Sequence, residues 1–133
     1  MGSKDKKHIV EKNKKFSDSF KHAYDGVIYA LFRERNMHVH FIMAVLVIIC
    51  GVFFNISYVE WLVCLILIAL VIILELLNTA IEAVVDMITT EESKLAKVAK
   101  DTSAGAVLVA SMVSAFIGLI IFIPKGIDFI MNL

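Results

Sequence analysis

Cysteine is scarce in this sequence, and the usual phosphate-binding loops are absent. The two cysteines, Cys50 and Cys64, lie inside apolar runs, where cysteine behaves as a small hydrophobic residue. They therefore suggest neither a disulfide framework nor a zinc site. The chain contains no GxxxxGK(S/T) and no GxGxxG motif, which excludes the common nucleotide-binding frameworks. Any handling of phosphate must depend on metal ions and on lysine or arginine side chains.

The chain also lacks the polar residues that a soluble domain of 133 residues needs. Hydrophobic residues make up 59% of it and the mean hydropathy is +0.83, which favours a single membrane-embedded domain over residues 1–133. Most lysines and arginines lie at or before Arg35, and only Lys125 follows the last apolar segment. The positive-inside rule then predicts a multi-pass plasma-membrane protein whose N-terminus and 88–101 loop face the cytoplasm.

The apolar segments predict an all-α fold with three transmembrane helices, at 37–54, 59–88 and 104–123. The second helix is about 45 Å long at 1.5 Å per residue and exceeds the roughly 30 Å hydrocarbon layer, so its end should project into the cytoplasm. Pro124 and Gly126 are expected to end the third helix. Small residues recur along that helix at spacings of three and four, which favours close helix packing and a homo-oligomer.

The N-terminal part of the chain has a different pattern. Residues 1–15 are lysine-rich and polar, which predicts a flexible tail. Residues 16–35 carry an apolar stripe at helical spacing, which predicts an amphipathic helix lying at the membrane interface or against the other helices. The stripe consists of Phe16, Phe20, Ala23, Val27 and Leu31.

Three carboxylates continue the apolar run of the second transmembrane segment. Glu75, Glu82 and Asp86 fall within roughly 20° of one line at 100° per residue, and Asn78 and Thr79 flank that line. Acidic residues aligned on a membrane helix usually mark a functional site. The alternative is that these acids are simply solvated beyond the membrane edge.

Depth in the membrane predicts different chemistry for the acids. Counted from Trp61, Glu75 lies about 21 Å along the helix and Glu82 about 31 Å. Glu75 is then partly desolvated, which makes it a candidate proton acceptor for the hydroxyl of a lipid. Glu82 is wetter and suits Mg²⁺, with Glu34 as a second ligand. Lys100, beside Asp101, is a candidate phosphate contact, whereas Lys94 and Lys97 could equally be topology determinants.

The pattern Glu75-x-x-Asn78-Thr79-Ala80-Ile81-Glu82-x-x-Val85-Asp86 closely resembles the signature of the prokaryotic diacylglycerol kinase family. Ala99-Lys100-Asp101 and the amphipathic helix ending in Glu34 extend the resemblance over about residues 16–123. The resemblance implies a homotrimer with composite active sites at subunit interfaces. It also implies that ATP and Mg²⁺ are used to phosphorylate a lipid alcohol.

Site roles follow from the resemblance residue by residue. It implies that Glu75 is the general base and contacts the lipid, and that Glu34 and Glu82 hold the metal. The same two glutamates would contact ATP, together with four further residues: Asn78, Asp86, Lys100 and Asp101. For Asp86 and Asp101, pairing with Lys or Arg is the alternative role.

Two N-terminal motifs are similar to the Gram-positive branch of the family, whose members mainly phosphorylate undecaprenol. They are Phe20-Lys21-His22-Ala23-x-x-Gly26 and Glu34-Arg35-Asn36-Met37-x-Val39-His40. Undecaprenol is therefore the expected acceptor, with diacylglycerol as the alternative. A structural or headgroup-facing role is expected for His38 and His40.

Two other functional classes compete with a kinase. A proton- or ion-translocating subunit would need acids across the membrane, but Trp61–Leu74 contains none. A purely structural membrane partner would leave the aligned acids without a role.

Overall fold

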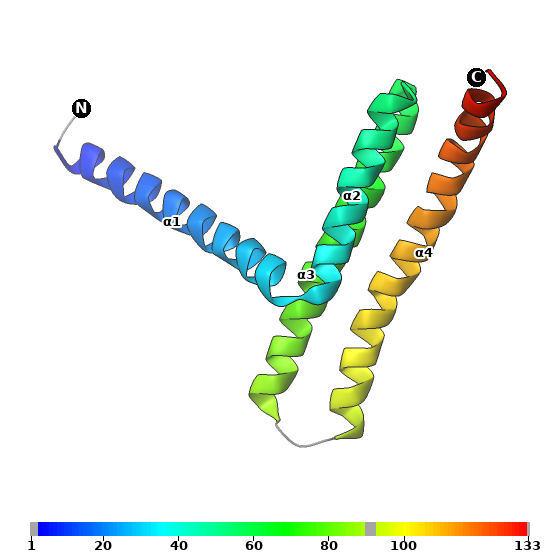
Figure 1. Cartoon of the computed structure of the whole chain (residues 1–133). Helices are drawn as coiled ribbons and strands as arrows, with labels where there is room; N and C mark the ends of the chain where they lie inside the picture. The colour runs from blue at the N-terminus through cyan, green and yellow to red at the C-terminus, as the bar shows by residue number, and fades with distance from the viewer. Residues whose placement is uncertain (1–2, 90–92, 133) are drawn as a thin grey trace. The chain divides into compact units, whose positions relative to one another are not determined.

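The computed structural model describes residues 3–89 and 93–132, with side chains from Lys15 onward. Within these ranges it contains four helices and no strand, which confirms the all-α prediction. The helices are α1 (Ser3–Arg33), α2 (Arg35–Phe53), α3 (Tyr58–Ile88) and α4 (Lys94–Met131) (Figure 1). The chain divides into two units, Met1–Arg33 and Glu34–Leu133.

The first unit is the single helix α1, which is longer than the sequence predicted. It begins at Ser3 and so includes most of the stretch expected to be a flexible tail. Residues 3–15 contain neither glycine nor proline and are rich in lysine, which has a high helix propensity. Near the other end of α1, the Arg33 guanidinium lies 5.5 Å from the centre of the Tyr29 ring.

The second unit contains the three helices α2, α3 and α4, which are long and apolar enough to cross a membrane. Large apolar side chains such as Ile42, Ile66 and Leu108 are exposed on them, as expected for surfaces that face lipid. The bounds of α2 and α3 lie within two residues of the predicted spans. The chain is accordingly a multi-pass membrane protein.

The turn between α2 and α3 is tight. Asn55 adopts a positive φ of 47°, which asparagine tolerates better than most residues. Ser57 then caps α3: its hydroxyl accepts a hydrogen bond from the Glu60 backbone N–H, and the Ser57 N–H donates to the Glu60 carboxylate at 2.7 Å. This reciprocal capping box makes α3 begin at Tyr58.

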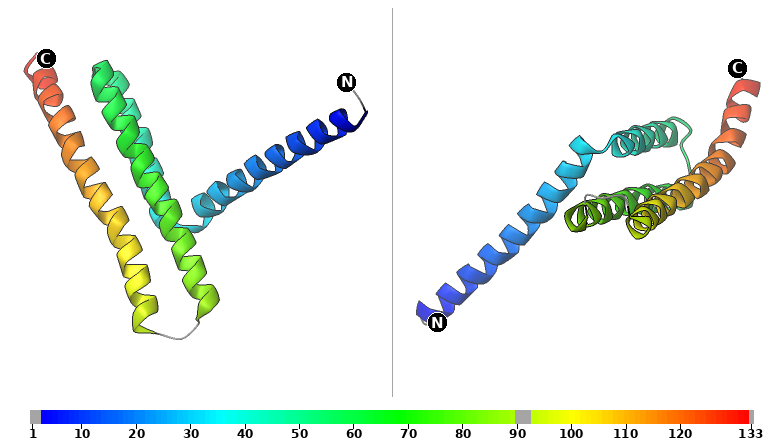
Figure 2. Two further views of the ribbon diagram at one scale, coloured as in Figure 1. Left: turned by 180° about the vertical axis from the view of Figure 1, so that it is seen from behind. Right: turned by 90° about the horizontal axis from the view of Figure 1, so that it is seen from below.

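Helix α3 is the centre of this unit, because both α2 and α4 pack against it. Helix α4 runs antiparallel beside α3, as the two views in Figure 2 show. At the Tyr58 end of α3, Ile56, Cys64 and Ile121 form a buried apolar cluster. The Lys125 ammonium also lies 3.1 Å from the Glu60 carboxylate there.

Helix α4 extends beyond the predicted span of 104–123 at both ends. The helix begins at Lys94, where the Ser93 hydroxyl accepts a hydrogen bond from the Ala96 N–H at 3.0 Å. It continues past Pro124 to Met131, so the expectation that Pro124 and Gly126 end it is wrong. Proline weakens a helix locally, but the turns that follow are held by the Lys125–Glu60 pair and by contacts of the Phe129 ring with Phe53 and Phe54.

Candidate functional site

Four buried polar side chains occur among the described residues, and all lie on α3 and α4. The exposed fraction is 1% for Glu75, 6% for Asn78, 8% for Thr79 and 8% for Ser103. Because an unpaired polar group is costly to bury, the interaction partners of these side chains indicate the role of the cluster.

Asn78 links α3 to α4. Its amide Nδ2 donates to Glu82 Oε1 at 3.0 Å, and its Oδ1 accepts a hydrogen bond from Ser103 Oγ at 2.6 Å. Both ends of the amide are therefore engaged, which sets its orientation and that of the Glu82 carboxylate. Ser103 is one of the small residues that recur along α4, and the sequence analysis did not predict this contact. Its position one turn after Lys100 was the available signal.

Glu75 is the most deeply buried acid of the site. Glu34, His40, Glu82 and the Asn36 side chain all lie near enough to influence its carboxyl group. Glu34 immediately precedes α2, so this carboxyl group is where the start of α2 meets the middle of α3. The structure thus brings three predicted residues, Glu34, Glu75 and Glu82, into one site.

Asn36 and His40 were not predicted as site residues. They are four residues apart on α2, a spacing that places two side chains on the same face of a helix. This spacing is visible in the sequence, but no neighbouring residue indicates that this face of α2 lies near Glu75. His40 had been expected to have a structural or headgroup-facing role.

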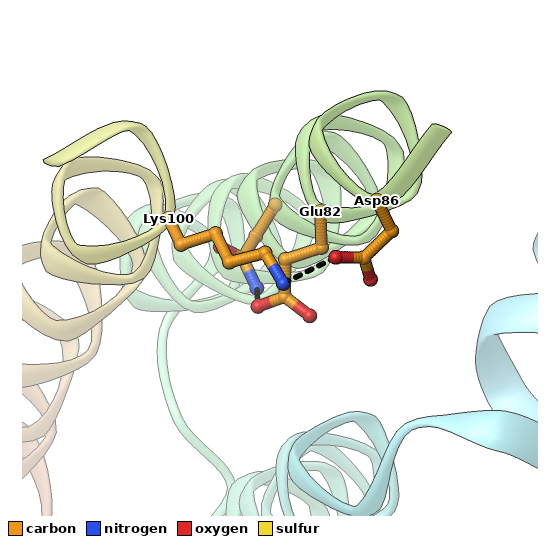
Figure 3. Close-up of polar contacts among 4 residues, drawn as sticks. Glu82, Asp86 and Lys100 are labelled. Atoms are coloured by element: carbon orange, nitrogen blue, oxygen red, sulfur yellow. Dashed lines mark hydrogen bonds and ion pairs between the residues drawn. The ribbon is translucent and has the colours of Figure 1, made fainter. Parts of the chain in front are cut away.

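The exposed end of the site carries opposite charges side by side. The Lys100 ammonium lies 2.6 Å from Asp86 Oδ1 (Figure 3), and the charge of the nearby Glu82 also acts on it. The side chains of Lys100 and Asp86 are 38% and 64% exposed, so the pair contributes only about 0.2–1 kcal/mol to stability. A cation held this weakly can rearrange towards a phosphate. Asp101, the next residue of α4, is exposed.

The donor set fits a hard divalent cation that is shared with a bound phosphate. Among the described residues, no group of three or more His, Cys, Asp and Glu side chains could hold a metal ion. Mg²⁺, however, is commonly bound by one or two carboxylates together with substrate phosphates and water. Glu34 and Glu82, both half-buried and both near Glu75, match that requirement.

The arrangement places the buried carboxylate of Glu75 near the wetter carboxylate of Glu82, and the latter near the partly exposed ammonium of Lys100. The first is suited to accept a proton from a group that enters from the membrane. The second and third are suited to bind phosphate through a cation and a direct contact. The site can thus meet an apolar acceptor on one side and a polar donor on the other.

The comparisons with known proteins agree with one another. The model of a family described as "Prokaryotic diacylglycerol kinase" matches residues 21–122. An undecaprenol kinase of Bacillus subtilis (strain 168) is 47% identical over 125 residues, which cover 94% of this chain and 99% of that protein. A diacylglycerol kinase of Synechocystis sp. is 39% identical over 107 residues, which cover 80% of this chain and 61% of that protein.

Proposed function

Because the chain belongs to the prokaryotic diacylglycerol kinase family, we propose that it transfers the γ-phosphoryl group of ATP to the hydroxyl of undecaprenol. Membership makes it a lipid kinase, with a nucleotide as phosphate donor and a membrane lipid as acceptor. The observation that carries the proposal is the buried carboxylate of Glu75 near the half-buried Glu82, which in turn lies near the partly exposed Lys100.

The choice of undecaprenol is supported by the relative from Bacillus subtilis, which is similar over practically its whole length. Diacylglycerol is the second candidate acceptor, because the relative from Synechocystis sp. is named for that activity. The latter similarity covers only 61% of that protein and therefore supports the acceptor less strongly.

Glu75 is the proposed general base and lipid contact. As the lipid oxygen forms its bond to the γ-phosphorus, the hydroxyl proton passes to the Glu75 carboxylate and the bond from phosphorus to the ADP oxygen breaks. Proton transfer of this kind contributes about 10²–10⁴-fold to a rate. Burial favours this role, because few water molecules can reach the carboxylate to stabilise its negative charge.

Nucleotide binding is proposed at the exposed end of the site. Glu34 and Glu82 would hold Mg²⁺, which supplies charge neutralisation for the phosphates. Lys100 would exchange its contact with Asp86 for a phosphate oxygen. Asn78, already hydrogen-bonded to Glu82, would keep that carboxylate oriented, and Asp86 and Asp101 would border the nucleotide.

We also propose that the site faces the cytoplasm and that the chain acts as a homotrimer. Cytoplasmic placement follows from the concentration of basic residues before Arg35 and around Lys94–Lys100. Oligomerisation is supported by the small residues that line α4 at helical spacing, which allow another helix to approach closely.

The test is direct phosphoryl transfer. The full chain, purified in detergent, is incubated with radiolabelled ATP, MgCl₂ and either undecaprenol or diacylglycerol. We expect labelled undecaprenyl phosphate as the main product and loss of that product on chelation of Mg²⁺. Transfer to neither lipid would contradict the proposal. Faster transfer to diacylglycerol would show that diacylglycerol, and not undecaprenol, is the preferred acceptor.

A further inference from the structure

Ser103 joins the two helices that carry the polar site, and the proposed function gives it no role. The residue is 8% exposed, and its hydroxyl donates to Asn78 Oδ1 at 2.6 Å. Asn78 belongs to α3 and Ser103 to α4. Because the contact is buried, water competes with it little, and it holds the two side chains in one arrangement.

The chemistry of the neighbouring groups fixes the direction of this hydrogen bond. An ionised carboxylate can only accept, so the Asn78 amide turns its Nδ2 towards Glu82, at 3.0 Å. The Asn78 Oδ1 then faces Ser103, whose hydroxyl has a single hydrogen to donate. The Lys100 carbonyl oxygen is a second acceptor for that hydrogen, at 2.9 Å, but Asn78 Oδ1 is closer. The hydroxyl hydrogen therefore goes mainly to Asn78.

The same hydrogen bond sets the spacing between two charged groups of the site. Glu82 lies four residues after Asn78, about one turn further along α3. Lys100 lies three residues before Ser103, about one turn back along α4. Because the two helices run antiparallel (Figure 2), both steps lead towards the same end of the unit. Figure 3 accordingly shows Lys100 extending from α4 towards the side of α3 that carries Glu82.

Removal of the hydroxyl would change both features. Asn78 Oδ1 would be buried without this donor, which costs more than the loss of the bond itself. The amide would gain by rotating away from Glu82 towards another donor, and the carboxylate would lose its fixed orientation. Loss of groups that orient metal ligands weakens metal binding, although such groups do not touch the metal.

We propose that Ser103 is a positioning residue for nucleotide binding: through Asn78 it orients the Glu82 carboxylate, and by joining α4 to α3 it fixes the distance between Glu82 and Lys100. The inference rests on the proposed function, in which Glu82 holds Mg²⁺ and Lys100 contacts a phosphate. Ser103 acts through these neighbours and not on ATP itself. The metal ligand and the phosphate contact are thereby kept at one spacing before ATP binds.

The test is Mg²⁺-dependent binding of radiolabelled ATP to the full chain in detergent, measured by equilibrium dialysis in the absence of lipid. For Ser103→Ala we expect the Mg²⁺ concentration for half-maximal binding to rise about three- to tenfold, as for the loss of one neutral hydrogen bond. In the transfer assay the KM for ATP should rise by a similar factor. The KM for undecaprenol should not change, because the lipid meets the other end of the site.

Ser114→Ala is the matched control. Ser114 is a half-buried serine of the same helix, and its hydroxyl donates to the Ala110 carbonyl oxygen at 2.8 Å, within α4 itself. The substitution removes the same atom and leaves the link between α3 and α4 in place, so the Mg²⁺ dependence should not change. Ser103→Cys, which keeps a weak donor, should give a smaller shift than Ser103→Ala and keeps the test valid if the alanine variant does not fold.

A double variant with Glu82→Gln separates positioning from a general structural effect. If Ser103 acts through the Glu82 carboxylate, Ser103→Ala should add little to the Mg²⁺ dependence once that carboxylate has become an amide. The effects of the two substitutions should therefore not be additive, as expected for residues of one hydrogen-bond network. A residue that only stabilises helix packing would give additive effects.

Three results would overturn the inference. An unchanged Mg²⁺ titration for Ser103→Ala, even with a lower Tm, would make the hydroxyl a packing contact only. Equal shifts for Ser103→Ala and Ser114→Ala would indicate a general weakening of α4. Additive effects with Glu82→Gln would show that Ser103 does not act through that carboxylate.

Failure of the proposed function would look different. Unaltered protein that binds ATP with Mg²⁺ but phosphorylates neither lipid would reject the proposed function, and the binding comparison would still decide the role of Ser103. Absence of Mg²⁺-dependent ATP binding by the unaltered protein would overturn both.

Discussion

Glu75 and Glu82 are two carboxylates on one face of α3, about two helical turns apart. Glu75 is 1% exposed, whereas Glu82 is half-buried and accepts a hydrogen bond from Asn78. A buried carboxylate is a stronger proton acceptor than a hydrated one, because water stabilises the charged form. Burial thus separates a proposed base from a proposed metal ligand, although the residue type is the same.

Glu75→Gln tests the proposed base. The amide keeps the shape of the side chain but cannot take the proton of the lipid hydroxyl. We expect kcat to fall about 10²–10⁴-fold, with thermal stability and ATP binding nearly unchanged. The measurement is transfer of radiolabelled phosphate to undecaprenol, with circular dichroism as the control for folding. Retention of more than a tenth of the activity would remove Glu75 from this role.

Glu82→Gln tests the proposed metal ligand. The variant can still accept a hydrogen bond from Asn78 but loses the negative charge that attracts Mg²⁺. We expect the Mg²⁺ concentration for half-maximal activity to rise, by about the 10–100-fold seen when groups that support a metal site are lost. A Mg²⁺ titration at saturating ATP measures it. An unchanged titration would contradict the assignment.

Lys100→Met tests the proposed phosphate contact. Since Lys100 and Asp86 are both partly exposed, stability should change by less than about 1 kcal/mol. The KM for ATP should rise about 10–100-fold, the equivalent of one charge-assisted hydrogen bond. Lys97→Met, an exposed residue of the same helix, is the matched control. Equal effects of the two variants would indicate a general charge effect instead of a contact.

At the scale of the helices, α3 is held at both ends. Towards its C-terminal end Asn78 accepts a hydrogen bond from Ser103 of α4, and near its N-terminal end Glu60 pairs with Lys125. Helix α2 also packs against the N-terminal end of α3, where Trp61 lies close to Gly51. These contacts fix how α2 and α4 flank α3, and so they position the polar site.

Gly51→Ala tests the contact between α2 and α3. A Cβ at Gly51 would lie 2.7 Å from Trp61 Cη2 and 3.1 Å from Ile56 Cδ1, which forces the packed end to shift. Overpacking of this kind costs about 1–3 kcal/mol, so the Tm in detergent should fall. Gly126→Ala, where the added Cβ meets nothing within 4 Å, should leave it unchanged. Equal Tm values would show that this packing is loose.

At the scale of the whole molecule, orientation in the membrane decides which compartment supplies the nucleotide. We predict that the loop before α4 faces the cytoplasm and that the turn at Asn55 faces outward. In a chain with Cys50 and Cys64 replaced by serine, Lys97→Cys should react with an impermeant maleimide only in inside-out vesicles. Asn55→Cys should react only in right-side-out vesicles. The reverse pattern would reject the proposed orientation.

Local pattern was sufficient to predict much of this protein. The spans of α2 and α3 and the acidic line on α3 are properties of short segments, in which hydropathy and helical period are read directly. The family assignment is confirmed by the comparisons. The start of α1 at Ser3 was not predicted, because the helix propensity of residues 3–15 outweighed their polar composition. The course of α4 past Pro124 was not predicted either, because tertiary contacts hold the turns that follow this helix-breaking residue.

The sequence alone determined that this chain is helical, that it resides in a membrane and that its acids share one helix face, since each depends on residues close together in the chain. Only the tertiary structure decided that Asn36 and His40 lie near Glu75 and that Ser103 hydrogen-bonds to Asn78. The physical reason is that these features require particular faces of separate helices to pack together. Spacing within a single helix does not specify which face of another helix it will contact.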